Sequence, residues 1–267
     1  MRVARTIWLL CVTGVAVVPF LWLLSTSLKG AEELFAYPPT FVPSTFVWEN
    51  YIGLWRAIPL GAYFINTVVV TLMSVFVNVL VSSLAGFAFA RLEFRYRPAL
   101  FYGVIAAILI PKEVIILPLY ATVLKMHLAD SLVGVALPFA VDGLGIFMMR
   151  QAFMAIPDEI EDAALVDGAS PLRLWWSIMV PMTKPTIATL TIFTFIAAWG
   201  DFLWPLVVLK SPENYTLQVG LSFMMGTFVD NFRYVAAGAV LSILPVFAVF
   251  VLMQKHFERG LFAGSSQ

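Results

Sequence analysis

The chain consists of long apolar runs separated by polar or proline-rich segments. A helix that spans a bilayer needs about 20 mostly apolar residues. Six apolar runs of unequal length cover residues 7–28, 62–90, 98–111, 132–154, 186–209 and 234–253. We therefore expect an all-α polytopic membrane protein with about six transmembrane helices, forming a single domain over residues 1–267. Prolines flank the apolar residues 114–117, which indicates an interfacial or broken segment there rather than a full crossing.

The N-terminal part predicts an anchor followed by a loop. The first run follows basic residues, as a signal peptide would, but it exceeds the roughly 7–15 apolar residues of a signal peptide and no Ala-x-Ala site follows it. We expect a retained anchor. Residues 29–61 contain four prolines, which prevent a long helix, together with aromatic residues suited to a membrane interface. We expect an ordered extracellular loop there.

Basic residues are distributed unevenly between the two sides of the expected spans. With the N-terminus in the cytoplasm, ten of the 16 Lys and Arg residues fall inside and six fall on longer outside loops. Cytoplasmic loops carry the excess of basic residues. An even number of spans also returns the C-terminus to the same side. We expect a multi-pass protein of the cell membrane with both termini cytoplasmic.

Composition supports the membrane assignment and excludes several other classes. Hydrophobic residues make up 61% of the chain and charged residues only 12%, whereas soluble domains have roughly 45–50% and 25%. The formal net charge of 0 gives no sign of nucleic-acid binding. One cysteine, Cys11, and two distant histidines, His127 and His256, indicate neither a disulfide nor a metal site.

The polar segment 155–185 carries the most specific pattern. Five of the 16 acidic residues lie within residues 158–167, with no basic residue among them. Pro157 is typical of a helix start and Gly168 of a helix end, while Ser170 followed by proline is typical of the start of a second helix. We expect two short helices at a sharp corner on the cytoplasmic side. The residues alone fit either a solvated connection or a surface that binds a partner chain.

This segment resembles the Glu-Ala-Ala signature of the permeases of ABC importers. The sequence reads Asp162-Ala163-Ala164, then Gly168, Ile178 and Val180-Pro181, with every interval of the signature kept. Asp162 replaces Glu and Val180 replaces Leu. Segments at 50–51, 87–92, 147–151, 167–170, 199–206 and 254–261 are similar to the carbohydrate, MalG-like branch, although residues 264–267 depart from the usual ending. The resemblance implies the type I ABC importer permease fold and transport of a sugar or sugar-like solute.

The resemblance also implies partners and the residues that meet them. These partners are a second homologous permease subunit, two cytosolic ATPase subunits and an extracellular solute-binding protein, with membrane lipid around them. The acidic helix would be the coupling helix seated on the ATPase, through Glu159, Glu161, Asp162, Ala163, Ala164, Asp167 and Gly168. No P-loop is present. We expect no catalytic residue and no cofactor on this chain, with ATP and Mg²⁺ on the partner ATPase driving alternating access.

Six polar or aromatic residues within the expected spans are candidates for the translocation pathway: Asn66, Asn78, Asp142, Trp199, Asp201 and Trp204. A charge within the membrane costs about 2.5–3.5 kcal/mol or more, so Asp142 and Asp201 should face the bundle interior or a watery cavity. The tryptophans flank Asp201, with Trp199 expected on the same side of its span. Helix-joining hydrogen bonds for the asparagines, bonding near a span end for the aspartates and interfacial anchoring for Trp204 are the alternatives.

Two other functional classes fit part of this pattern. A secondary transporter or channel would have similar spans but does not need the acidic corner. An intramembrane aspartyl protease would need two touching carboxylates, and the sequences around Asp142 and Asp201 match neither its Tyr-Asp nor its Gly-x-Gly-Asp motif. The permease of an ABC importer is therefore the function we expect.

Overall fold

The computed structural model describes residues 2–225 and 232–262, with side chains described over 5–225 and 232–253. Every element in these ranges is helical, which confirms the all-α expectation for this part of the chain. The longer helices are α1 Arg2–Ser27, α4 Leu60–Arg91, α5 Arg97–Ile108, α8 Gly143–Met154, α12 Lys184–Trp199 and α15 Phe232–Phe262. The shorter ones are α2 Ala31–Leu34, α3 Glu49–Ala57, α6 Ile116–Lys125, α7 Leu132–Ala136, α9 Asp158–Val166, α10 Pro171–Leu174, α11 Val180–Met182, α13 Leu203–Val208 and α14 Leu217–Met225. Short 3₁₀ segments lie at Lys112–Ile115 and Pro212–Asn214, and a π-helical turn lies at Trp175–Met179.

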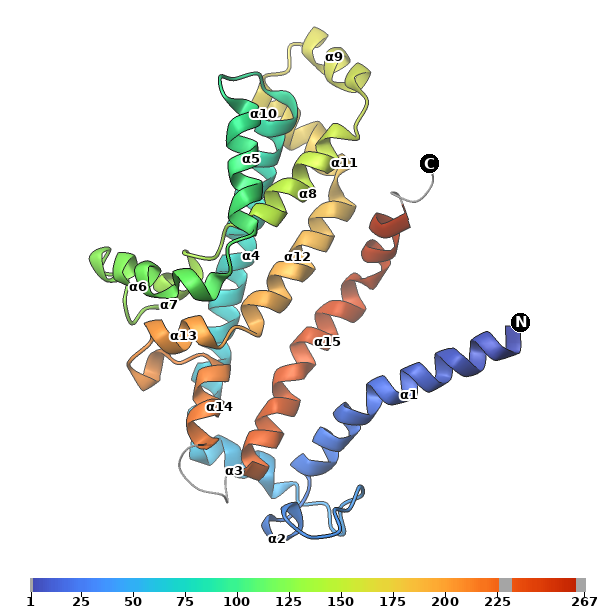
Figure 1. Ribbon diagram of the computed structural model, residues 1–267, viewed down its shortest axis with the longest axis vertical. Helices are drawn as coiled ribbons and strands as arrows, with labels where there is room; N and C mark the ends of the chain where they lie inside the picture. Colours follow the sequence, from blue (N-terminus) through green and yellow to red (C-terminus); the bar gives the residue numbers. More distant parts are fainter. Residues whose placement is uncertain (1, 226–231, 263–267) are drawn as a thin grey trace.

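The helix α4 is the centre of the bundle (Figure 1). It packs against α8 and α12, and α15 packs against the far side of α12. The helix α9 lies at one end of the elongated molecule, while α2 and α3 lie at the other (Figure 1). The apolar helix α1 contacts α15 but leans away from the bundle, and none of its membrane-length window is buried.

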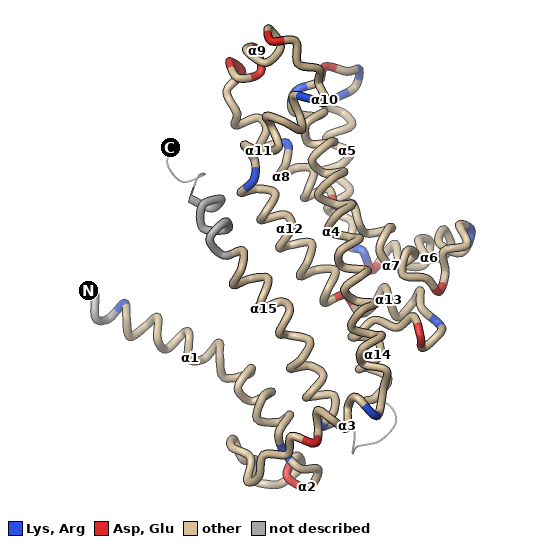
Figure 2. Tube along the Cα trace, turned by 180° about the vertical axis from the view of Figure 1, so that it is seen from behind, with Lys and Arg blue, Asp and Glu red and all other residues tan. Residues whose placement is uncertain are grey.

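The number of membrane crossings depends on how two bent helix pairs are read. Arg5–Ser27, Leu60–Arg91 and Phe232–Met253 are each long and apolar enough to cross a membrane. The pairs Arg97–Ile108 with Lys112–Lys125 and Pro171–Met182 with Lys184–Trp199 pass the same test together, with bends of 95° and 81°. The described residues thus contain three to five candidate spans. Figure 2 shows long stretches of these helices without charged residues, and most charges near the helix ends.

Two of the expected spans are broken rather than continuous. The run 132–154 forms α7 and then α8, separated at 137–142, and the run 186–209 forms α12 and then α13, separated at 200–202. Pro138 lies in the first break, where a proline disrupts helical hydrogen bonding. Gly200 ends α12 at the second break. The expected pairing of apolar runs with single helices is wrong at both places, because two short apolar helices give the same pattern as one long helix.

Close contact between α4 and α8 depends on a glycine. A Cβ atom added to Gly86 would lie 2.7 Å from Cβ of Met149 and 2.8 Å from the backbone nitrogen of Arg150. Small residues allow helices in membranes to approach closely and gain packing contacts. Phe87 and Met149 belong to the buried cluster beside this crossing. This close packing holds α4 against α8, the helix that precedes α9.

Candidate functional site

The acidic segment forms the two-helix corner that the sequence predicts. Helix α9 begins after Pro157 and ends at Val166, and Gly168 then adopts the left-handed conformation with φ +77°. Glycine takes this conformation without the steric cost of a Cβ atom. The oxygen of Ser170 accepts a hydrogen bond from the backbone nitrogen of Arg173 at 3.4 Å and so caps α10. These local signals confirm the predicted corner.

A buried arginine at the end of α4 holds this corner in place. The side chain of Arg91 is only 8% exposed and pairs with Asp158 and, at 3.3 Å, with Glu161. Its Nη2 also donates to the backbone oxygens of Phe153, at 2.8 Å, and Ile156. Hydrogen bonds from a charged donor are stronger than neutral ones. The start of α9 is thus fastened to the central helix.

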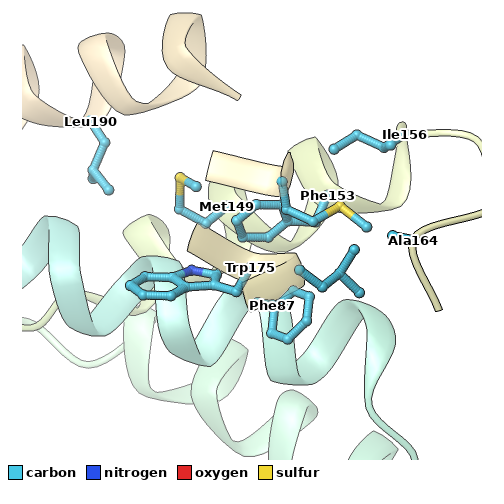
Figure 3. Packing of buried hydrophobic residues seen from close by; sticks show 9 residues of the cluster. Phe87, Met149, Phe153, Ile156, Ala164, Trp175 and Leu190 are labelled. Atoms are coloured by element: carbon cyan, nitrogen blue, oxygen red, sulfur yellow. The ribbon is translucent and has the colours of Figure 1, made fainter. Parts of the chain in front are cut away.

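The predicted coupling residues divide between the two faces of the corner. Glu159, Asp162, Ala163, Asp167 and Gly168 are exposed. Glu161 instead turns inward to Arg91, with 19% of its side chain exposed. Ala164 is 6% exposed and packs inside the chain with Phe153 and Ile156 (Figure 3). Contrary to expectation, Ala164 does not lie on the free face, and its small size serves packing within this chain.

Exposed apolar side chains beside the acidic residues were not predicted. Leu165 is 49% exposed and Val166 is 87% exposed. They end a helix whose outer face also carries Glu159 and Asp162. A face that combines exposed apolar and charged side chains is suited to contact with another protein. The signal was present in the sequence, because both residues directly follow the Asp162-Ala163-Ala164 motif.

A cavity of about 340 Å³ lies among α4, α7, α8 and α12. Three of the six candidate pathway residues line it: Asn78, Asp142 and Asp201. Ser74, Thr194 and Lys112 add further polar groups to its wall. The cavity thus brings together charged and hydrogen-bonding groups from segments far apart in the chain.

Both aspartates occupy helix breaks rather than the middle of helices. The carboxylate of Asp142 caps α8 by accepting from the backbone nitrogen of Leu144 at 3.1 Å. The carboxylate of Asp201 accepts from the backbone nitrogen of Trp204 at 3.4 Å, between α12 and α13. Among the described residues, each carboxylate thus accepts from a backbone nitrogen of its own helix start, and no hydrogen bond joins the two.

Asn78 connects three elements around the cavity. Its Nδ2 donates to Oγ1 of Thr194 at 2.8 Å on α12. Its Oδ1 accepts from Ser82 at 2.7 Å and from the backbone nitrogen of Asp142 at 3.4 Å. Hydrogen bonds of this kind join helices in a membrane. Asn78 therefore has a clear structural role in addition to its position on the cavity wall.

The other three candidate pathway residues lie outside this cavity. Asn66 donates to the backbone oxygens of Glu213 and Tyr215, at 2.8 Å and 3.0 Å. Trp199 is 2% exposed and donates to the backbone oxygen of Ser242 on α15 at 2.9 Å, so it does not share the side of Asp201. The ring nitrogen of Trp204 donates to the backbone oxygen of Val135 at 3.1 Å. Trp204 does line a smaller adjoining pocket of about 190 Å³ together with Asp201.

Lys112 is one of the six basic residues expected on the outside loops, and the structure places it at the cavity. It lines both pockets with Asp201, and its amine lies 5.1 Å from the centre of the Phe139 ring. The segment beginning at Lys112 is bent by 95° from α5, and Lys112 at the bend lies beside the cavity while α6 projects sideways from the bundle (Figure 1). The prolines flanking 114–117 indicated a broken segment, which the structure confirms, but they did not indicate its direction.

Away from the cavity, the carboxylate of Asp130 holds two loops together; we call this contact the loop clamp. Asp130 accepts from the backbone nitrogens of Lys210, at 2.8 Å, and Ser211, at 3.0 Å, and from the hydroxyl of Ser211. The hydroxyl and backbone donors of Ser211 hold the pKa of Asp130 well below its ordinary value, because they stabilise the charged carboxylate. The clamp fixes the turn before α7 against the loop after α13.

Comparison with known proteins gives consistent matches along the chain. The model of the family "Binding-protein-dependent transport system inner membrane component" matches residues 78–263. The arabinooligosaccharides transport system permease protein AraQ of Bacillus subtilis (strain 168) is 32% identical over 266 residues, covering 98% of this chain and 95% of the relative. The sn-glycerol-3-phosphate transport system permease protein UgpE of Pectobacterium atrosepticum is 32% identical over 238 residues, covering 86% of this chain and 85% of the relative.

A solved structure shares the fold. It is described as a bacterial ABC transporter involved in the import of the acidic polysaccharide alginate. One of its chains matches with a TM-score of 0.85 and 23% identity, covering 96% of both chains. The residues that the family model matches, 78–263, include the acidic corner, α7, α8, α12 and the second part of α4 from Asn78 onward. The chain belongs to the family of inner membrane components of binding-protein-dependent transport systems.

Proposed function

We propose that this chain is the permease subunit of an ATP-driven importer for a sugar or sugar-like solute. In this proposal six spans form a single domain, both termini face the cytoplasm, and residues 29–61 form the extracellular loop. The relatives support the solute class, because their names specify arabinooligosaccharides and sn-glycerol-3-phosphate. A separate pair of ATPase subunits binds ATP and Mg²⁺, while a second permease and a solute-binding protein complete the assembly.

The observation that carries this proposal is a physical connection between the corner and the cavity. One end of α4 holds Arg91, which fastens α9, and its middle holds Asn78, which lines the cavity. Gly86 packs against α8 between them. A force applied to the exposed face of α9 is therefore transmitted to the helices around the cavity. This arrangement suits mechanical coupling, in which ATPase closure reorients the permease without covalent chemistry on this chain.

The exposed part of the corner is the proposed contact with the ATPase. Glu159, Asp162 and Asp167 offer carboxylates, and Ala163 and Gly168 let another backbone approach closely. Leu165 and Val166 add apolar contact area. Glu161 and Ala164 act indirectly, by keeping the corner attached to α4 and to the core.

The proposed pathway includes the cavity with Asn78, Asp142 and Asp201. Their oxygen and nitrogen atoms suit the hydroxyl groups of a sugar. Trp204 lies beside this cavity at the adjoining pocket, where its buried ring packs edge-on against Phe139 and supports the wall. Asn66 and Trp199 support the pathway from outside, by fastening the loop before α14 and the neighbouring α15.

Reconstitution of the purified subunits into liposomes tests the proposal. The chain, a second permease, the ATPase pair and the binding protein should together give ATP-dependent sugar uptake, and omission of any one of them should abolish it. Sugar-stimulated uptake by this chain with only its ATPase would refute the need for a second permease. Sugar uptake that does not depend on ATP would favour a secondary transporter or channel.

A further inference from the structure

A second polar pocket lies where α4 ends and α5 begins, apart from the cavity. Its volume is about 300 Å³, and its lining residues are Phe89, Arg97, Pro98, Phe101, Tyr102 and Arg150. Two of them are arginines, from the start of α5 and from α8, and none is acidic. We propose that this pocket binds the phosphate of an anionic phospholipid headgroup.

The two guanidinium groups are held in place by backbone oxygens. Arg97 donates from Nε to Phe89 at 2.9 Å and from Nη2 to Ala90 at 2.8 Å. Arg150 donates from Nε to Phe89 at 3.1 Å, and its guanidinium lies 4.1 Å from the centre of the Phe101 ring. These contacts fix the orientation of each group before any ligand binds. The acceptors are uncharged backbone oxygens, so the positive charges of Arg97 and Arg150 are not neutralised.

Several donors of these arginines remain available. A guanidinium has five N–H donors, and the hydrogen bonds of the described residues leave Nη1 of Arg97 and both Nη groups of Arg150 without an acceptor. The ion pairs in the described ranges involve Arg56 and Arg91, not these two residues. A phosphate group provides the charge and the paired oxygens that an arginine fork binds best. The N-terminus of α5 adds partial positive charge at the same place.

The surroundings of the pocket favour a lipid as the source of the phosphate. None of the residues of α5 is buried within the chain. Tyr102, which lines the pocket, is 71% exposed; on the same helix, Leu100 is 55% exposed and, farther along, Ile108 is 40% exposed. An apolar surface that starts at a phosphate site can accept an acyl chain. Basic pockets between transmembrane helices are known binding places for anionic headgroups.

The position along the molecule agrees with a membrane interface. The pocket lies where the long apolar helix α4 ends, and α9 projects beyond it (Figure 1). A protein partner at the corner would meet α9 first, whereas a headgroup would lie level with the ends of the apolar helices. The pocket would hold one lipid against α4, α5 and α8.

Native mass spectrometry of the full chain tests this inference. The chain is purified in a nonionic detergent and titrated with phosphatidylglycerol, with phosphatidylcholine or with inorganic phosphate. The wild type should retain one phosphatidylglycerol in preference to phosphatidylcholine. The double variant R97Q/R150Q should bind it about a hundredfold more weakly, at about tenfold for each charge-assisted contact removed.

The matched control is R95Q/R173Q, which removes two positive charges from residues that do not line the pocket. It should keep the bound phosphatidylglycerol. Because Arg97 and Arg150 also cap α4, a second variant, R97K/R150K, keeps both charges but removes the forks, and it should bind more weakly than wild type. Equal loss in the control, or unchanged binding in both pocket variants, would overturn the inference. Equal binding of inorganic phosphate would show a free anion site instead of a lipid site.

Discussion

Replacement of Arg91 by alanine should uncouple the corner from the bundle. Its side chain is 8% exposed and contacts Glu161, Asp158 and two backbone oxygens. Asp158 is 83% exposed, so its ion pair adds about 1 kcal/mol or less. The two backbone oxygens accept from a charged donor, at about 1.5–3 kcal/mol each. The replacement also leaves Glu161 unpaired. Because contributions from one side chain are not additive, we take the cost of breaking a buried pair by removing one partner, about 3–5 kcal/mol, for the whole group.

Such a loss should detach α9 while the rest of the bundle stays folded. A local cost of about 3 kcal/mol corresponds to roughly a hundredfold change in an opening equilibrium, so amide exchange in residues 158–168 should accelerate by about that factor. In the reconstituted transporter, sugar uptake per ATP hydrolysed should fall. The variant Arg173→Ala is the control, because Arg173 forms no ion pair among the described side chains. Unchanged exchange together with unchanged uptake per ATP would refute the role of Arg91 as the anchor.

Three further predictions concern the corner, the cavity and the loop clamp. Gly168→Asp should leave membrane insertion intact but reduce ATPase retention in a pull-down and abolish uptake. Gly168→Asn should have a milder effect, because asparagine tolerates a positive φ. ATPase retention by Gly168→Asp equal to that of the wild type would contradict the proposed contact. Asp201→Leu should impair uptake strongly and Asp201→Asn less so, with normal assembly in both, and native uptake by the leucine variant would remove Asp201 from the pathway. Asp130 has a lowered pKa, so its stabilisation is complete above its unfolded pKa of about 3.9 and is lost as pH falls below it. Asp130→Asn should therefore show a smaller loss of thermal stability between pH 7 and about pH 3 than wild type does.

The parts that the sequence predicted well depend on local interactions. Gly168 and Ser170 act on their own helix ends, so their identity and spacing were sufficient to predict the corner. Family resemblance supplied the interpretation of that corner as a coupling surface. The length and composition of the apolar runs likewise predicted helices for a membrane, because these properties do not depend on neighbours in space.

The parts that were missed depend on how distant helices pack. The sequence shows that Ala164 is small, but only the positions of Phe153 and Ile156 show that it faces inward. Likewise, an apolar run with a proline and an aspartate can form a kinked span or two helices. Lys112 follows a proline at a span end, and nothing nearby in the sequence indicates that it turns toward Asp201.

The break before α8 has a consequence for how the chain is assembled in the membrane. Residues 137–142 place backbone groups outside regular helical hydrogen bonding, which hydrocarbon does not tolerate unless protein or water satisfies them. Part of that satisfaction comes from α4, where Asn78 accepts from the backbone nitrogen of Asp142 at 3.4 Å. During synthesis, α4 emerges before residues 132–154. Asn78 is therefore already available when this segment enters the bilayer, so the order of synthesis matches the order in which these contacts are needed.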